Sequence, residues 1–111
     1  MALRKLEKQQ WHAYFDGVSK TLGGKQAEVE VDSLQIGAQI EAEWLPLLGI
    51  VYDHKSDIIE VLLEGLDHLI QKPQDVYVDQ EGLALTSMEV VDADDVRQII
   101  RLRDPLMLPP P

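Results

Sequence analysis

The sequence predicts an α+β domain in which one N-terminal amphipathic helix packs on a strongly twisted antiparallel sheet, or on a small open barrel, of six to seven strands. Two observations lead to this class. Apolar residues recur at helical spacing near the N-terminus, whereas from residue 27 onward short apolar runs are separated by turn-forming residues at hairpin spacing. The candidate strand segments lie at about 27–32, 38–44, 48–52, 58–63, 66–71, 76–78, 83–91 and 96–103.

A helix is expected at about residues 7–22. Its apolar residues follow one another at intervals of three and four, which places them on one helix face; they are Trp11, Tyr14, Phe15, Val18 and Leu22. Gly23 and Gly24 then supply a stop, because glycine adopts the left-handed conformation that closes a helix. We expect Trp11 and Phe15 to be largely buried against the sheet.

The next two segments are typical of half-buried strands whose outward faces are acidic. Apolar residues alternate with polar, mostly acidic ones at 27–32 and again at 38–44. The expected inward-facing residues are Ala27, Val29 and Val31, followed by Ala38, Ile40, Ala42 and Trp44. Residues 33–37 form the connection. Pro46 must end or bend the second strand, because proline cannot donate a hydrogen bond to a sheet ladder.

The segments at 48–52 and 58–63 flank a polar loop at 53–57, as the two strands of a hairpin do. Both segments are apolar at odd and at even positions, a pattern typical of central strands that are covered on each face. The segment 66–71 fits either a short helical turn or a strand, and a strand is favoured. A short strand follows at 76–78.

The last hairpin pairs 83–91 with 96–103 across a loop of turn-forming residues. Its second strand carries three arginines on one face, Arg97, Arg101 and Arg103. We expect these arginines to pair with acidic side chains of neighbouring strands rather than to bind a separate anion. The tail at 104–111 is apolar, and its prolines exclude regular structure. Such a tail packs along its own domain or contacts another protomer.

Length and composition describe one globular domain spanning residues 1–111. The net charge is −10, and residues 26–95 hold 17 acidic residues against two basic ones. A surface of this charge repels phosphates, so no nucleic-acid partner is expected. The absence of cysteine excludes disulfides and cysteine-based metal sites. No segment has the apolar run of a signal peptide or a membrane span, so we expect a cytoplasmic protein with no membrane partner.

Two Asp-His dipeptides supply the candidates for a metal site, which are Asp53, His54, Asp57, Asp67 and His68. Adjacent residues on a strand point to opposite faces, so neither dipeptide chelates by itself. Together, the two histidines and a nearby aspartate would suit zinc or another divalent ion if the fold brought them into contact. The favoured interpretation is one histidine in a solvated loop and another hydrogen-bonded at a sheet edge. No catalytic residue, cofactor or cofactor-binding residue is predicted.

Several blocks of the sequence resemble those of one protein family. The blocks are Trp11 with Phe15, Gly49–Asp53, Asp57–Val61, His68–Pro73 and Ile100–Pro105. As a set they make the chain similar to a small uncharacterised bacterial family, a domain of unknown function of about this length. The resemblance covers nearly the whole chain and implies a one-domain bacterial protein, but it brings no activity with it.

The sequence therefore predicts a non-enzymatic cytoplasmic domain that acts through protein–protein contacts, including self-association as a dimer. The tail residues Leu106, Met107 and Leu108 are expected in the interface, and a different protein partner is also compatible with the pattern. One alternative is a metal-binding protein or hydrolase-like enzyme that uses His54, His68 and nearby aspartates. A second alternative, a nucleic-acid module, is disfavoured by the net charge.

Overall fold

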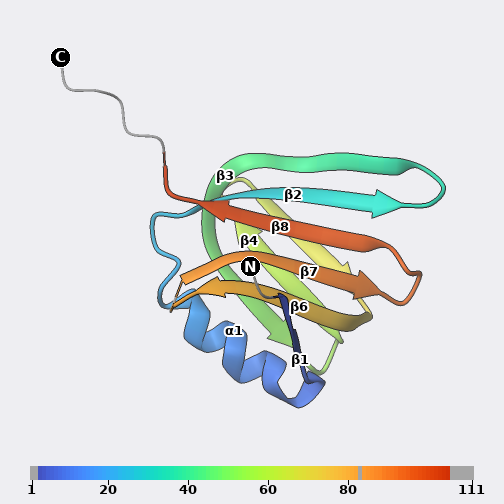
Figure 1. Ribbon diagram of the computed structural model, residues 1–111, viewed down its shortest axis with the longest axis horizontal. Helices are drawn as coiled ribbons and strands as arrows, with labels where there is room; N and C mark the ends of the chain where they lie inside the picture. Colours follow the sequence, from blue (N-terminus) through green and yellow to red (C-terminus); the bar gives the residue numbers. More distant parts are fainter. Residues whose placement is uncertain (1–2, 83, 106–111) are drawn as a thin grey trace.

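A computed structural model describes residues 3–82 and 84–105 of the chain. Eight strands, each antiparallel to its neighbours, form one open sheet in the order β1-β6-β7-β8-β2-β3-β4-β5 (Figure 1). The strands are β1 Leu3–Leu6, β2 Gln26–Ser33, β3 Gly37–Asp53, β4 Ile58–Leu63, β5 Leu66–Gln71, β6 Pro73–Glu81, β7 Ala84–Asp92 and β8 Arg97–Arg103. Between β1 and β2, a 3-10 turn at Lys8–Gln10 leads directly into helix α1, Trp11–Ser19.

The predicted α+β class is wrong. The described chain is mostly sheet, and its helical segment has only nine α-helical and three 3-10 residues. The sheet is antiparallel, as predicted, but it has eight strands instead of six to seven, and it is an open sheet rather than the small open barrel of the second alternative. The physical reason is that the sheet bends on itself and supplies both walls of its own core. The helix therefore closes one edge and does not form a separate layer.

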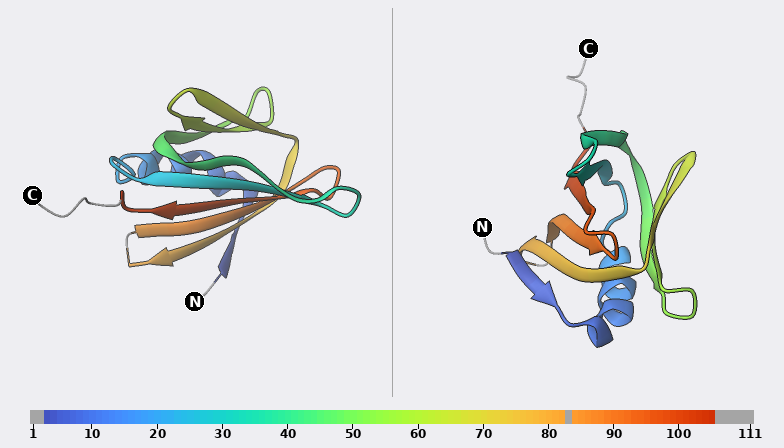
Figure 2. Two further views of the ribbon diagram at one scale, coloured as in Figure 1. Left: turned by 90° about the horizontal axis from the view of Figure 1, so that it is seen from above. Right: turned by 90° about the vertical axis from the view of Figure 1, so that its right-hand side faces the viewer.

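Strand β3 is the element at which the sheet bends. Its first part, as far as Pro46, pairs with β2, and the part from Leu47 onward pairs with β4. Register shifts interrupt both ladders near this change of partner, and Trp44 there has a positive φ of 51°. Bulges of this kind bend a strand and increase its twist. The segments predicted at 38–44 and 48–52 are thus one strand that bends near Pro46, and Figure 2 shows β4 and β5 standing across from β6, β7 and β8.

The alternation predicted for 38–44 is wrong at most positions. Of the four residues expected to face inward there, only Ala42 is buried, and residues 37–41 are all exposed. The ladder shifts register between Val29 and Glu30, so that Val29 lies opposite Ala42 whereas Glu30 lies opposite Ile40. Since opposite residues share a sheet face, this bulge places Ile40 beside an outward-facing glutamate.

The core lies between the two parts of the bent sheet, with α1 along one side (Figures 1 and 2). Trp11 and Phe15 are fully buried, which confirms their prediction as core residues. The Trp11 indole N–H donates to the Leu6 carbonyl at 3.3 Å, and its ring meets the Tyr52 ring edge-on, with centroids 5.1 Å apart. The helix ends at Ser19, earlier than predicted, and Leu22 reaches the core from the turn that follows it.

The remaining strands follow the sequence prediction in part. The segment 66–71 is a strand, β5, as favoured over a helical turn. The short strand predicted at 76–78 extends in both directions and forms β6. Strand β1 was not predicted, because four residues that include two basic ones show no alternation of apolar and polar side chains. It forms because Leu6 enters the core while its backbone pairs with β6.

Candidate functional site

The predicted metal ligands of the β3–β4 turn are engaged in holding the turn itself. Asp53 accepts a hydrogen bond from the Lys55 backbone N–H at 3.0 Å, and hydrogen bonds from the Ser56 hydroxyl and from Lys55 lower its pKa. Asp57 accepts a hydrogen bond from the Tyr52 hydroxyl at 2.8 Å, and the Lys8 ammonium lies 3.6 Å from the same carboxylate oxygen. The carboxylates of this turn therefore have local structural partners.

The other two candidates, Asp67 and His68, lie on opposite faces of β5 as their adjacency predicts. His68 lies opposite Val61, three ladder positions from the start of β4, so it is about 10 Å along the strand from the β3–β4 turn. Ligands of one metal ion lie within a few ångströms of one another, since each is about 2 Å from the ion. Within residues 3–82 and 84–105, no group of three or more His, Asp or Glu side chains is placed to hold a metal ion.

His68 instead connects the two parts of the bent sheet. Its Nε2 lies within hydrogen-bond distance of the Gln98 side-chain oxygen on β8. Gln98 uses its amide nitrogen to donate to Asp92 at 3.1 Å, so its oxygen is the acceptor and the histidine is the donor. Gln98 is buried, and this chain of hydrogen bonds satisfies its polar atoms. The expectation of a histidine that is hydrogen-bonded near a sheet edge agrees with this geometry.

A second histidine contact was not predicted. His12 on α1 and His54 in the β3–β4 turn lie with ring centroids 6.4 Å apart, at an interplanar angle of 82°. The two residues are far apart in the sequence, and no spacing rule joins a helix position to a distant turn. Only the packing of α1 beside the second part of β3 brings them together.

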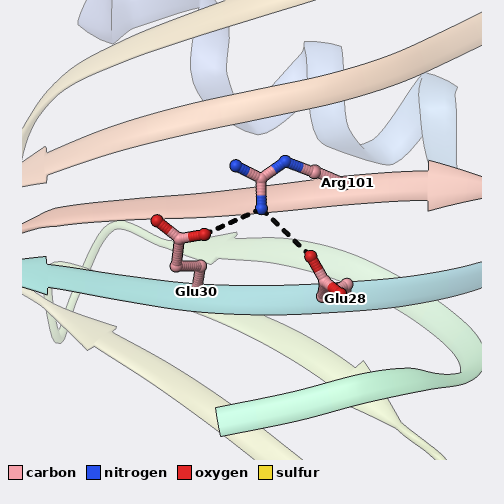
Figure 3. Close-up of polar contacts among 3 residues, drawn as sticks. All are labelled: Glu28, Glu30 and Arg101. Carbon is pink, nitrogen blue, oxygen red and sulfur yellow. Dashed lines mark hydrogen bonds and ion pairs between the residues drawn. The ribbon is translucent and has the colours of Figure 1, made fainter. Parts of the chain in front are cut away.

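The basic stripe of β8 is neutralised by its neighbours, as predicted. Arg101 donates to Glu28 and to Glu30 on β2, each at 3.0 Å (Figure 3), and the hydrogen bond that it donates to Glu30 is the main cause that raises the pKa of Arg101. Arg97 pairs with Glu89 on β7 at 3.0 Å. Arg103 donates to the Gln26 side chain and lies over the Trp44 ring, 4.0 Å from its centroid. The guanidinium groups are thus occupied by side chains of the same sheet.

An exposed apolar surface lies on the side of β3, β4 and β5 that faces away from the core. Its apolar side chains are Leu48, Val51, Ile58, Leu62 and Leu69, here called the outer apolar face. Leu48 is 67% exposed, Leu69 47% and Val51 42%. The sequence predicted that these central strands would be covered on both faces, but no described element covers this one (Figure 2). Carboxylates of Asp53, Glu60 and Asp67 lie within the same face.

The outer apolar face continues to an open edge of the sheet. Among the described residues β5 pairs only with β4, and its second edge has no strand beside it. The opposite edge of the sheet, β1, is different: it has four residues, with Lys5 paired to Asp75 at 3.2 Å and Arg4 bonded to Gln80 at 3.0 Å. Short strands with basic side chains resist further pairing, whereas a longer apolar edge invites it.

A second exposed apolar surface is the tip of the β2–β3 hairpin, which extends past the rest of the sheet in Figure 1. Leu34 is fully exposed at this tip, and Ile36 and Ile40 are also exposed. The predicted interface residues Leu106, Met107 and Leu108 lie outside the described residues. Among the described residues, no helix is long and apolar enough to cross a membrane.

Comparisons with known proteins agree with the resemblance seen in the sequence blocks. An uncharacterized protein from Aquifex aeolicus (strain VF5) is 42% identical over 110 residues, which cover 98% of this chain and 99% of the relative. The bacterial source of this relative fits the predicted bacterial family. No solved structure matches the chain. A family model described as a family of unknown function, DUF5335, matches residues 2–111, and the chain therefore belongs to the DUF5335 family.

Proposed function

We propose that this protein is a non-enzymatic, cytoplasmic domain that works through protein–protein contacts, including self-association, made by the outer apolar face. The observation that carries the proposal is the exposure of Leu48, Val51 and Leu69 on one sheet face, where Val51 and Leu69 lie on either side of Glu60. Exposed apolar side chains gathered on one face of a small domain mark interaction sites, because leaving them in water costs about 25 cal/mol for each Å².

The charge distribution supports this choice of surface. The chain carries a net charge of −10, yet the outer apolar face concentrates leucine, isoleucine and valine side chains around three carboxylates. The exposed surface of β2, β7 and β8 is instead polar, because arginines of β8 pair there with glutamates of β2 and β7. The outer apolar face is thus suited to close contact with a protein surface.

Self-association tests the proposal without a known partner. We expect the full chain to sediment as a dimer at tens of micromolar, and the variant Leu69→Thr to shift the equilibrium toward monomer. Threonine is well accepted in strands, so this replacement removes apolar contact area while the backbone of β5 keeps its strand conformation. The matched control is Leu34→Thr at the hairpin tip, which makes the same replacement on a different exposed surface and should leave the dimer intact.

A monomeric full-length chain at this concentration would contradict the proposed self-association. A dimer that responds to the Leu34 variant instead of the Leu69 variant would place the contact elsewhere. The tail also belongs to the proposal, since Leu106, Met107 and Leu108 are apolar residues in a small domain with limited interior. A chain that ends at Asp104 should therefore dimerise more weakly. Unchanged dimerisation would show that the tail takes no part in the contact.

A further inference from the structure

The direction of the backbone groups in β5 can be worked out from its hairpin. Leu63 and Leu66 face each other across a two-residue loop that contains Gly65, whose φ is 81°. Residues that close such a loop exchange hydrogen bonds, and bonding then alternates along the ladder. Leu66 and every second residue after it therefore bond toward β4.

The other end of β5 supports the same alternation. The Lys72 backbone N–H donates to the Asp57 carbonyl at 2.9 Å, so residue 72 also bonds toward the β3–β4 side. Counting from either end, Asp67, Leu69 and Gln71 direct their N–H and C=O groups to the open edge. These three residues form a complete docking row for one more antiparallel strand.

We infer that the strand that docks there is β5 of a second copy, related by a twofold axis at Leu69. The inference rests on the proposed function, because it names the partner of the same surface. In this arrangement Leu69 faces Leu69 of the second copy, and each Asp67 faces a Gln71. All three outward-directed residues then form hydrogen-bonded pairs, which makes six main-chain hydrogen bonds across the two strands.

Side-chain chemistry selects this register over its neighbour. The carboxylate of Asp67 lies beside an amide that donates hydrogen bonds, and the two leucines extend the outer apolar face across both copies. A shift that places Asp67 opposite Leu69 leaves one outward-directed pair unused and puts the carboxylate against an apolar side chain. The pairing also keeps His68 and Ile70 on the inner face of both copies, because residues of equal parity meet.

Repulsion between the Glu60 carboxylates of the two copies is small at this contact. Glu60 lies opposite Leu69 on the neighbouring strand, so the two Glu60 residues are separated by three strand spacings, about 14 Å. This distance exceeds the Debye length of about 8 Å at physiological ionic strength, so their repulsion is largely screened. A twofold contact also closes after two copies, whereas pairing of β5 with β1 of another copy would leave free edges and grow into polymers.

Engineered cysteines test the register, since the chain has no cysteine of its own. The Leu69→Cys variant should form a disulfide-linked dimer on mild oxidation, because facing residues of a hydrogen-bonded antiparallel pair have Cα atoms about 5.5 Å apart, within disulfide range. Asp67→Cys and Gln71→Cys should each fail to cross-link alone but cross-link when mixed. Val51→Cys is the control, because Val51 is about as exposed as Leu69 but lies two strands from the edge.

A proline provides a second test that does not depend on oxidation. The Leu69 N–H points to the open edge, so Leu69→Pro removes a donor from the dimer contact without removing one from the β4 ladder. We expect dimerisation to weaken at least about tenfold, since two main-chain hydrogen bonds are lost in the dimer. Leu69→Thr, which keeps the N–H, should weaken it less. Circular dichroism should show the same sheet content in both variants.

The outcomes separate this inference from the proposed function. If sedimentation shows a dimer but Leu69→Cys cross-links no better than Val51→Cys, the edge pairing is overturned and self-association stands. If the unmodified chain is a monomer, both ideas fail. Polymers larger than a dimer, or cross-linking of Asp67→Cys alone, would also overturn the twofold register at Leu69.

Discussion

The Ser19 hydroxyl makes two hydrogen bonds with the backbone of one residue, Ile50: it donates to the carbonyl at 2.8 Å and accepts from the N–H at 3.0 Å. A neighbouring strand would satisfy the same two groups in an ordinary sheet. After β3 bends away from β2, the last residue of α1 thus takes the place of a strand beside it. The short helix is an edge cover for β3, which explains how so few helical residues complete the core.

Replacing this serine should destabilise the fold more than its size suggests. In Ser19→Ala both backbone groups of the fully buried Ile50 lose their partner, and each unsatisfied group costs about 1–3 kcal/mol. We expect the free energy of unfolding to fall by about 2 kcal/mol in urea denaturation. Thr21→Ala is the control, because its hydroxyl bonds only to Val18 within the helix end at 2.8 Å. Equal losses in the two variants would contradict the role of Ser19 at the β3 edge.

Trp11 should be a main contributor to core stability. It is 1% exposed and contacts Tyr52 and the Leu6 carbonyl, so Trp11→Ala should cost about 3–5 kcal/mol, as for a large aromatic side chain removed from a core. Thermal unfolding followed by circular dichroism measures the effect. Leu34→Ala, at the fully exposed hairpin tip, should change stability by less than about 0.5 kcal/mol. An unchanged melting temperature for Trp11→Ala would show that α1 is not part of the cooperative core.

Alkaline unfolding should depend on Tyr52. Burial, with the nearby Asp57 carboxylate, raises the pKa of Tyr52 to about 12 from its usual value of 10.0. A folded pKa above the unfolded one means that the neutral phenol stabilises the native state below pH 10, and that this stability is lost as pH rises from about 10 to 12. We expect a steep fall of the melting temperature in that window.

Tyr52→Phe checks this assignment. The phenylalanine variant lacks the titrating group, so its melting temperature should fall less steeply between about pH 10 and 12. At neutral pH it should lose about 1 kcal/mol with the hydrogen bond to Asp57. Identical alkaline profiles for the two proteins would assign the transition to other groups.

The ion pairs of Figure 3 should contribute more to the free energy of unfolding than a typical surface ion pair does. Arg101 serves two carboxylates, Glu28 and Glu30, whose side chains are only 18% and 17% exposed. Arg101→Met should therefore cost about 1–2 kcal/mol, because two neighbouring carboxylates on one strand lose their shared cation. Arg97→Met should cost less, because Arg97 is more exposed than Arg101 and its removal leaves only one carboxylate, Glu89, without its partner. Adding Glu28→Gln and Glu30→Gln to Arg101→Met should restore most of the loss in urea denaturation.

Added salt should stabilise the protein at pH 7. Ion pairs within the described residues engage six carboxylates, Glu28, Glu30, Asp57, Asp75, Glu89 and Asp104, out of 20 acidic residues in the chain. Screening therefore relieves more repulsion than attraction. The melting temperature should rise as sodium chloride is increased from low ionic strength. A steady decrease would mean that the paired charges dominate.

Local patterns in the sequence determined the features that depend on neighbouring residues. The helical spacing of Trp11 and Phe15 marked their buried face, and Leu66–Gln71 formed the favoured strand. The arginines of β8 met carboxylates because both sets lie on the outward face of adjacent strands. Periodicity predicts which side chains share a face, and this prediction holds wherever a helix or strand is regular.

Only the tertiary structure decided what happens where the chain departs from regularity. The register shift beside Val29 and Glu30 turned Ile40 outward, although its sequence alternates without interruption. The bend of β3 folded the sheet over its own core, so the sequence alone placed the protein in the wrong class. The same bend brought His12 beside His54 and left Leu48 and Leu69 uncovered. A bulge or a bend is stabilised by packing between strands that are distant in the sequence. A local apolar pattern shows that a side chain is apolar, but it does not show which element or which second molecule covers that side chain.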